Sequence, residues 1–384
     1  MSHTYSKLAG ISAAALSLAA PIAVAAAQAA PTDTTPKISV SAFVDGYFAW
    51  DFGRPPSLDR SFAGGTPFTT QPARHNEFNV NLAFVDVKLD APHYRGRFAV
   101  QTGTSVQSNY SGEPTRGTIS GPSLGRLIQE AVVGVKIADN LWVDGGIFYS
   151  HMGMESWASR DNPTYTRSLV AEYSPYYQSG VKMTWAPTAK LTAQVDLVNG
   201  WQNISENNSG KGAGVRLDYA ATGSSTLSYY NLFTSEAGSK LRTFNGVGAK
   251  QTHGQLTLLG EFDYGSQSKG SRGGQSTWYG WTAVARVQTS PTAALVFRVE
   301  GYEDPHQVII ATGNFGPASV KSRPNPAFRA VGGSVGLDIT PYARLAWRSE
   351  LRGWRNGAAL FPDGTKPTSV RNSIVSVTSL SLTF

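Results

Sequence analysis

The chain has 384 residues, among them 40 Gly, 9 Trp, 16 Tyr and 17 Phe. It contains no cysteine, which excludes a disulfide framework and thiolate chemistry. The formal net charge is +7, but the sequence shows no basic run and no nucleic-acid-binding motif. A nucleic-acid partner is therefore not expected.

Residues 1–29 are predicted to be a signal peptide. Lys7 gives a weakly positive start, residues 8–24 form a short run rich in Ala and Leu, and Ala27 and Ala29 give the A-x-A form of a cleavage site. A transmembrane anchor is the alternative, but the run is too short and too rich in Ala. We expect an exported chain with a short tail, 30–37, and a folded part, 38–384. No later apolar run is long enough for a spanning helix, which leaves a soluble periplasmic protein or an outer-membrane β-barrel.

The folded part alternates between apolar and polar residues with a period of two, which is typical of β-strands with two different faces. In the second predicted strand the parity changes at Phe84 and Val85, which predicts a β-bulge there. The predicted strands are 38–50, 78–89, 97–108, 126–138, 141–150, 177–186, 191–201, 212–221, 226–234, 241–252, 255–264, 276–289, 293–303, 328–339, 343–355 and 370–384.

Short turns alternate with longer polar loops along these strands, as they do in outer-membrane barrels. Charged residues keep to one parity, for example Arg298 and Glu300, although a solvated face of a soluble sheet would give the same alternation. The expected fold is an all-β, transmembrane, antiparallel up-and-down barrel of about 16 strands. It has short periplasmic turns, long extracellular loops and a third loop folded into the lumen.

The last strand ends with apolar residues at alternate positions, Leu380, Leu382 and Phe384. This ending resembles the signal that the barrel-assembly machinery of the outer membrane reads. We therefore expect the chain to meet that machinery, to reside in the cell outer membrane and to contact its lipids.

The third loop, about 151–175, is long, charged and aromatic. We expect it to form a pore constriction that carries both charge signs, with the residues Glu155, Arg160, Asp161, Arg167 and Glu172. The candidate pore-wall residues are Asp45, Arg126, Arg348 and Arg352. Charge rings and pore diameter set the selectivity of such pores, and the positive net charge favours weak anion preference. In the alternative interpretation these charges pair with one another and anchor the loop, and both can hold.

Several segments resemble one family. They are 43–52 (FVDGYFAWDF), 75–81 (HNEFNVN), 129–131 (QEA), 153–156 (GMES), 159–162 (SRDN), 165–169 (YTRSL), 174–177 (SPYY) and 198–202 (VNGWQ). These segments are similar to the putative β-barrel porin-2 (OmpL-like) family of outer-membrane proteins, and the resemblance extends over most of the exported chain. It implies a porin-like channel of the outer membrane.

An enzyme is not expected. Ser150 and His151 are adjacent on one predicted strand and point to opposite faces, which disfavours a catalytic dyad. No P-loop, dinucleotide fingerprint or metal-ligand spacing is present, so no cofactor and no metal are expected.

The expected function is a passive, water-filled channel for small hydrophilic solutes or ions, with a homotrimer as a possible assembly. The alternative is a receptor, adhesin or structural barrel that works through its loops around a closed lumen.

Overall fold

The computed structural model describes residues 35–236, 240–269, 274–313, 326–364 and 369–384, and the compact unit considered below is Pro36–Phe384. The predicted signal peptide, 1–29, and most of the predicted tail, 30–37, lie outside the described residues. None of the helices in the described part of the chain is long and apolar enough to cross a membrane.

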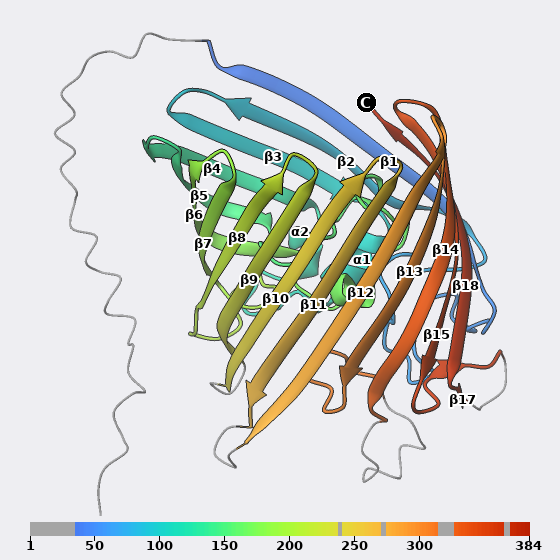
Figure 1. The fold of residues 1–384 in the computed structure, drawn as a ribbon. Coiled ribbons are helices and arrows are strands. Elements are labelled where there is room, and N and C mark those ends of the chain that lie inside the picture. Colours follow the sequence, from blue (N-terminus) through green and yellow to red (C-terminus); the bar gives the residue numbers. More distant parts are fainter. Residues whose placement is uncertain (1–34, 237–239, 270–273, 314–325, 365–368) are drawn as a thin grey trace, which may run out of the picture. The chain divides into compact units, whose positions relative to one another are not determined.

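Sixteen strands form one closed antiparallel barrel (Figure 1). Strands β1 to β14 each pair with the next strand in the sequence, and β18 closes the barrel by pairing with both β15 and β1. The number of strands and the up-and-down order agree with the sequence-based prediction. A two-stranded ribbon lies in the last long loop. The barrel strands are β1 (Lys37–Asp51), β2 (Phe78–Asp90), β3 (Tyr94–Thr102), β4 (Ile128–Ala138), β5 (Leu141–Tyr149), β6 (Tyr177–Thr188), β7 (Leu191–Val198), β8 (Gly212–Thr222), β9 (Ser225–Glu236), β10 (Lys240–His253), β11 (Leu256–Ser268), β12 (Gln275–Ser290), β13 (Ala293–Asp304), β14 (Phe328–Tyr342), β15 (Leu345–Asn356) and β18 (Asn372–Thr383), and the ribbon is β16 (Phe361–Pro362) with β17 (Ser369–Val370).

The two ends of the barrel differ in the length of their connections. At one end the turns have three residues or fewer, from 91–93 between β2 and β3 to 343–344 between β14 and β15. The other end carries loops 52–77, 103–127 and 150–176, which we call the first, second and third loops. The start of β1 and the end of β18 both lie at the short-turn end, and β18 meets β1 several residues into that strand, where the Phe384 N–H donates to the Ala42 carbonyl at 2.9 Å.

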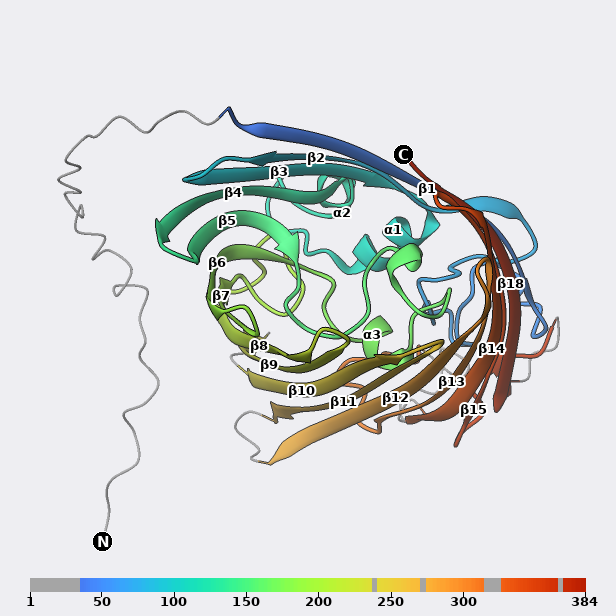
Figure 2. The same ribbon diagram turned by 45° about the horizontal axis from the view of Figure 1, so that its top comes forward.

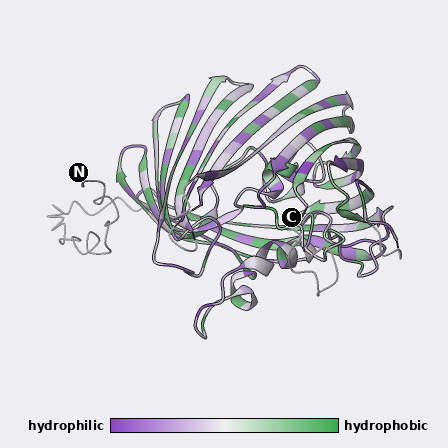
Figure 3. Ribbon diagram, turned by 90° about the horizontal axis from the view of Figure 1, so that it is seen from below, coloured by the Kyte–Doolittle hydropathy of each residue, from purple (hydrophilic) through white to green (hydrophobic). Residues whose placement is uncertain are grey.

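The strands separate apolar from charged residues on their two faces. Along β13, Leu295, Phe297 and Val299 are exposed, whereas Arg298 and Glu300, which alternate with them, are buried inside the barrel. Figure 3 shows the same alternation of hydrophobic and hydrophilic residues along the strands. A charge on the lipid face of such a barrel costs about 2–4 kcal/mol at the membrane midplane, so the segregation is what a bilayer requires.

The bulge in β2 lies at Asn81 rather than at Phe84 and Val85. Asp45 of β1 pairs with Leu82, and the next residue, Gly46, pairs with Val80, so Asn81 is the additional residue. Leu82 and Phe84 consequently point inward, although the period-two pattern places them on the lipid side. Their burial explains the shift, because they pack in the lumen with an apolar cluster that includes Phe43, Val106 and Tyr110.

The third predicted strand, 97–108, ends earlier in the structure. β3 stops at Thr102, and the chain turns into the lumen as helix α1 (Thr104–Asn109). Gly103 makes this turn with a φ of 133°, and a Cβ there would lie 2.3 Å from the Asn81 carbonyl oxygen. Only glycine fits this backbone conformation and this close approach. The second loop continues through a 3₁₀ turn, Tyr110–Gly112, and helix α2 (Pro122–Gly125) before β4.

Candidate functional site

The third loop, 150–176, folds into the barrel and crosses its lumen. It contains a 3₁₀ turn, η3 (Ser159–Asp161), and a short helix, α3 (Leu169–Glu172). Figure 2 shows α1 and α3 inside the ring of strands. The loop contacts both Arg216 of β8 and Arg348 of β15, which come from different sides of the barrel wall. The predicted inward fold of the third loop is confirmed.

Four buried charges on β13 and β15 attach the loop to the wall, and we call them the wall quartet: Arg298, Glu300, Glu350 and Arg352. Arg298 Nη2 lies 2.6 Å from Glu350 Oε1, and Arg352 Nη2 lies 2.7 Å from Glu300 Oε1. All four residues are at most 3% exposed. Because removing one partner of a buried ion pair leaves an unpaired charge, such a network tolerates the loss of a member poorly.

The wall quartet binds the backbone of the loop. Glu350 accepts the Thr166 N–H at 2.8 Å, and Arg298 donates to the Thr166 carbonyl at 2.7 Å. Arg352 donates to the Arg167 carbonyl at 2.6 Å, and Glu300 accepts the Leu169 N–H at 2.7 Å. The last bond satisfies a free N–H in the first turn of α3, where a carboxylate is also favoured by the helix dipole.

The tip of the loop is held by Asp45 and Arg348. The Asp45 carboxylate accepts hydrogen bonds from Asn81 at 2.8 Å and from the loop hydroxyl of Ser159 at 3.0 Å. Arg348 donates to the carbonyls of Ser159 and Pro163 at 2.5 and 2.8 Å. Asp45 and Arg348 are both buried, because the loop covers their side chains on the lumenal side of the wall.

The start of the loop is attached to the opposite part of the wall. His151 Nε2 lies 2.7 Å from the Asn231 carbonyl of β9, and His151 Nδ1 lies 3.0 Å from Asp196 of β7. Arg216 of β8 donates to the carbonyls of His151 and Gly153, both at 2.8 Å. His151 therefore holds the loop against β7, β8 and β9, and among the described residues Ser150 is not one of its hydrogen-bond partners.

Arg167 lies at the centre of the loop, with its guanidinium carbon 3.9 Å from the ring centre of Tyr176 and 4.5 Å from that of Trp157. It forms an ion pair with Glu172 at 3.6 Å and a hydrogen bond with Thr70 of the first loop. Its side chain is fully buried. A planar guanidinium suits this stacked position better than a lysine ammonium.

Glu155 is half-buried and is hydrogen-bonded by the loop itself. Its two carboxylate oxygens accept the Ser168 N–H at 3.3 and 3.0 Å. Burial raises the pKa of Glu155 above its usual range, while nearby Arg298 and the hydrogen bonds from Ser168 oppose the rise.

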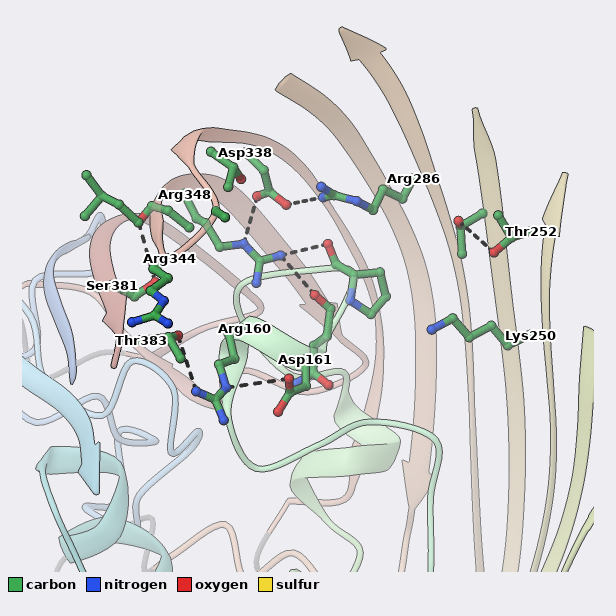
Figure 4. Close-up of a pocket in the computed structure, with 17 residues that line it drawn as sticks. Arg160, Asp161, Lys250, Thr252, Arg286, Asp338, Arg344, Arg348, Ser381 and Thr383 are labelled. Atoms are coloured by element: carbon green, nitrogen blue, oxygen red, sulfur yellow. Dashed lines mark hydrogen bonds and ion pairs between the residues drawn. The ribbon is translucent and has the colours of Figure 1, made fainter. Parts of the chain in front are cut away.

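Arg160 and Asp161 are the loop charges that face open space. Their side chains are 28% and 53% exposed, whereas those of Arg167 and Glu172 are at most 1% exposed. They line a cavity of about 470 Å³ between η3 and the short turns, which we call the basic cavity (Figure 4). Its charged residues are Arg160, Asp161, Lys250, Arg286, Asp338, Arg344 and Arg348.

A second cavity of about 250 Å³ lies against β2 to β6 and is lined by the charged residues Lys88, Asp90, Arg95, Arg97, Glu130, Asp144 and Lys182. A third, of about 240 Å³, lies beside the loop and includes Glu155 and Arg216. No group of three or more residues able to hold a metal ion occurs within the described ranges.

The remaining predicted site residues lie elsewhere. Arg126 is exposed at the end of α2, because β4 begins only at Ile128. Leu380, Leu382 and Phe384 point outward from the last strand with exposed side chains. The sequence-based site omitted Lys250, Arg286 and the pair Arg298 and Glu300. The inward parity of their strands was the signal that could have found them.

Residues 37–384 match the protein family described as putative β-barrel porin-2, OmpL-like. Among solved structures, the chain is similar to Salmonella typhi OmpF in complex with daunomycin, with 12% identity over 91% of this chain and 98% of that chain and a TM-score of 0.59. It is similar to the outer-membrane channel DcaP of Acinetobacter baumannii, with 11% identity over 92% and 99% and a TM-score of 0.57. An anion-selective porin from Comamonas acidovorans matches with 11% identity over 91% and 100% and a TM-score of 0.55. At these identities the likeness concerns the fold. Comparison with curated proteins finds no significant match.

Proposed function

The chain belongs to the putative β-barrel porin-2, OmpL-like family of outer-membrane porins, and we propose that it is a passive, water-filled channel with weak anion preference. Its solutes would be small and hydrophilic. A 16-stranded barrel is wide enough to leave an aqueous passage beside a folded-in loop. The proposal concerns the mode of transport and the selectivity of this porin.

The charge of the lumenal cavities carries the proposal of anion preference. The basic cavity has five Lys or Arg residues against two Asp residues. The cavity against β2 to β6 has four Lys or Arg residues against three Asp or Glu residues, and the cavity beside the loop has one of each sign. Fixed charge of one sign raises the local concentration of counter-ions, so anions would be favoured.

The attachments of the third loop favour a second candidate function, a barrel with a closed lumen that works through its loops. The loop is held by the wall quartet, by Asp45 and Arg348, and by His151 and Arg216, so it crosses the lumen from one side to the other. A loop held so firmly would suit a receptor, an adhesin or a structural barrel as well as a constriction.

Conductance separates the two candidates. The full chain, refolded and inserted in a planar bilayer, is expected to give large, steady current steps. Under a KCl gradient the reversal potential should have the sign of anion preference. A correctly folded, heat-modifiable barrel that conducts no current would exclude the channel and leave the closed barrel.

Replacement of Arg348 by Gln is expected to move the reversal potential towards cations, since it removes a lumenal charge. It also removes the hydrogen bonds to Ser159 and Pro163, so the conductance should change as well. Measuring both quantities separates the loss of charge from the release of the loop.

The remaining proposals concern export and assembly. We propose that residues 1–29 are a signal peptide, that Leu380, Leu382 and Phe384 are read by the barrel-assembly machinery, and that the barrel forms a homotrimer in contact with outer-membrane lipids. The N-terminal sequence of the mature protein and its mass in mild detergent test the first and third of these. Phe384→Ala should slow assembly into the outer membrane without changing the folded barrel.

A further inference from the structure

The basic cavity is formed by parts of the chain that are far apart in sequence. Arg160 and Asp161 come from η3, Lys250 from β10 and Arg286 from β12, while Arg344 lies in the turn between β14 and β15. In Figure 4 the side chain of Lys250 extends from its strand towards the loop, on the other side of the cavity from Arg344. The cavity thus lies in the lumen between the third loop and the short-turn end of the barrel.

Two of its arginines are fixed by one shared carboxylate. Asp338 accepts a hydrogen bond from Arg348 Nε at 2.8 Å and forms a second ion pair with Arg286. One negative charge therefore holds two guanidinium groups and leaves an excess of positive charge. Because the two side chains are already ordered, binding of an anion beside them would cost little conformational entropy.

Arg160 is also held in place. Its guanidinium lies 5.1 and 5.2 Å from the ring centres of Phe43 and Phe84 and donates to the Thr383 hydroxyl at 3.3 Å. Its neighbour Asp161 is 3.6 Å away, but that carboxylate is half exposed. Screening by water makes such an exposed pair weak, so an anion in the cavity can compete for this guanidinium.

Lys250 and Arg344 have no carboxylate within 4.0 Å among the described residues, and both are exposed to the cavity. The hydroxyls of Thr252, Thr257 and Ser381 lie in the same lining. Guanidinium and ammonium groups with nearby hydroxyls are the donors that bind carboxylate and phosphate oxygens.

We propose that the basic cavity binds small oxyanions with two negative charges, such as inorganic phosphate or a short dicarboxylate. This proposal rests on the proposed anion-favouring channel. The five cations and two carboxylates leave a formal excess of three positive charges. Lys250 and Arg344 face the cavity from opposite sides, and a dianion carries twice the charge of chloride, so the excess positive charge of the lining attracts a dianion more strongly. The volume of about 470 Å³ suits a small solute with some of its water.

The test uses the full chain and two double variants that each remove two lumenal cations. Lys250→Gln with Arg344→Gln changes the basic cavity, and within the described part of the chain neither side chain forms a hydrogen bond or an ion pair with the third loop. Lys88→Gln with Lys182→Gln is the matched control, because both lysines line the cavity against β2 to β6. Two readouts are measured for each protein: block of the KCl current by added potassium phosphate, and equilibrium binding of phosphate to the barrel in detergent.

In the wild-type protein phosphate should bind and should reduce the chloride current. The variant of Lys250 and Arg344 should need about tenfold more phosphate for both effects, while the control should stay within about twofold of wild type. Potassium succinate should act in the same way as phosphate. Retained phosphate binding in a barrel that conducts no current would support the site and overturn the proposed channel.

Three outcomes would overturn the site. If both double variants lost the phosphate block of the KCl current equally, the block would depend on the total lumenal charge and not on the basic cavity. Normal anion-selective current with neither block nor binding would reject the site and leave the proposed channel intact. Unchanged phosphate binding after replacement of Lys250 and Arg344 would place the phosphate elsewhere.

Discussion

Arg298 of β13 and Glu350 of β15 meet at 2.6 Å with both side chains buried, although β14 separates their strands in the barrel wall. They reach each other over the inner face of β14, and the Thr166 backbone completes the contact. The third loop is thus attached to the wall by charges that are themselves paired. A change that weakens this attachment should therefore both destabilise the loop and widen the passage beside it.

Replacement of Glu350 by Ala should release this attachment. It removes the acceptor of the Thr166 N–H and leaves Arg298 buried without its nearest carboxylate. The expected cost is about 3–5 kcal/mol in the free energy of unfolding, measured by urea titration in detergent. Single-channel currents should become larger and noisier as the loop moves.

The matched control is Glu303→Ala, which removes a carboxylate from the same strand as Arg298. Glu303 is 40% exposed and lies 4.0 Å from Arg329, so its loss should cost little. Quiet, wild-type currents in the Glu350 variant would show that the wall quartet does not hold the loop.

Replacement of Arg167 by Lys should destabilise the centre of the loop. Lysine keeps the positive charge but loses the planar group between Tyr176 and Trp157, so a loss of about 1–2 kcal/mol is expected. Arg355→Lys is the control, because Arg355 is exposed near the end of β15. If both variants unfold at the same urea concentration as wild type, the stacking of Arg167 contributes nothing measurable.

The stability of the barrel should depend on pH through Glu155. Since burial raises the pKa of this carboxyl, the folded state binds its proton more tightly than the unfolded state does. The stabilising effect of the proton is complete below the unfolded pKa and is lost as the pH rises through the folded pKa.

Glu155→Gln removes this contribution. The difference in unfolding temperature between wild type and the variant should therefore favour wild type increasingly as the pH falls from neutral into the acid range. Midpoints of the heat-modifiable gel shift measure this difference across the pH series. A difference that stays constant with pH would contradict the assignment.

Replacement of Gly214 by Ala should displace His151. A Cβ at Gly214 would lie 2.4 Å from His151 Nε2 and 2.6 Å from the Asn231 carbonyl oxygen, so the hydrogen bond between them could not remain. We expect a loss of about 1–3 kcal/mol and increased current noise. Gly145→Ala is the control, because its nearest atom would be 4.0 Å away. Equal behaviour of the two variants would mean that His151 does not position the loop.

The sequence by itself determined the number of strands, their order and the face that most strand residues present. A period of two and short turns are local signals, and a bilayer penalises charge on the outer face, so charges such as Arg298 and Arg348 had to point inward. The early end of β3 and the position of the bulge were less visible. The end of β3 depends on the close approach of Gly103 to Asn81, and the bulge depends on the burial of Leu82 and Phe84 in the lumen, and the tertiary structure creates both.

Only the tertiary structure decided which inward charges hold the loop and which face open space. Thr166 and Glu350 are 184 residues apart, and their hydrogen bond depends on closure of the barrel and on the path of the loop inside it. Arg348 lies under the loop, while Arg344 four residues earlier lines the cavity without an ion-pair partner among the described residues. The two arginines have the same chemistry, and their different neighbours across the lumen give them different roles.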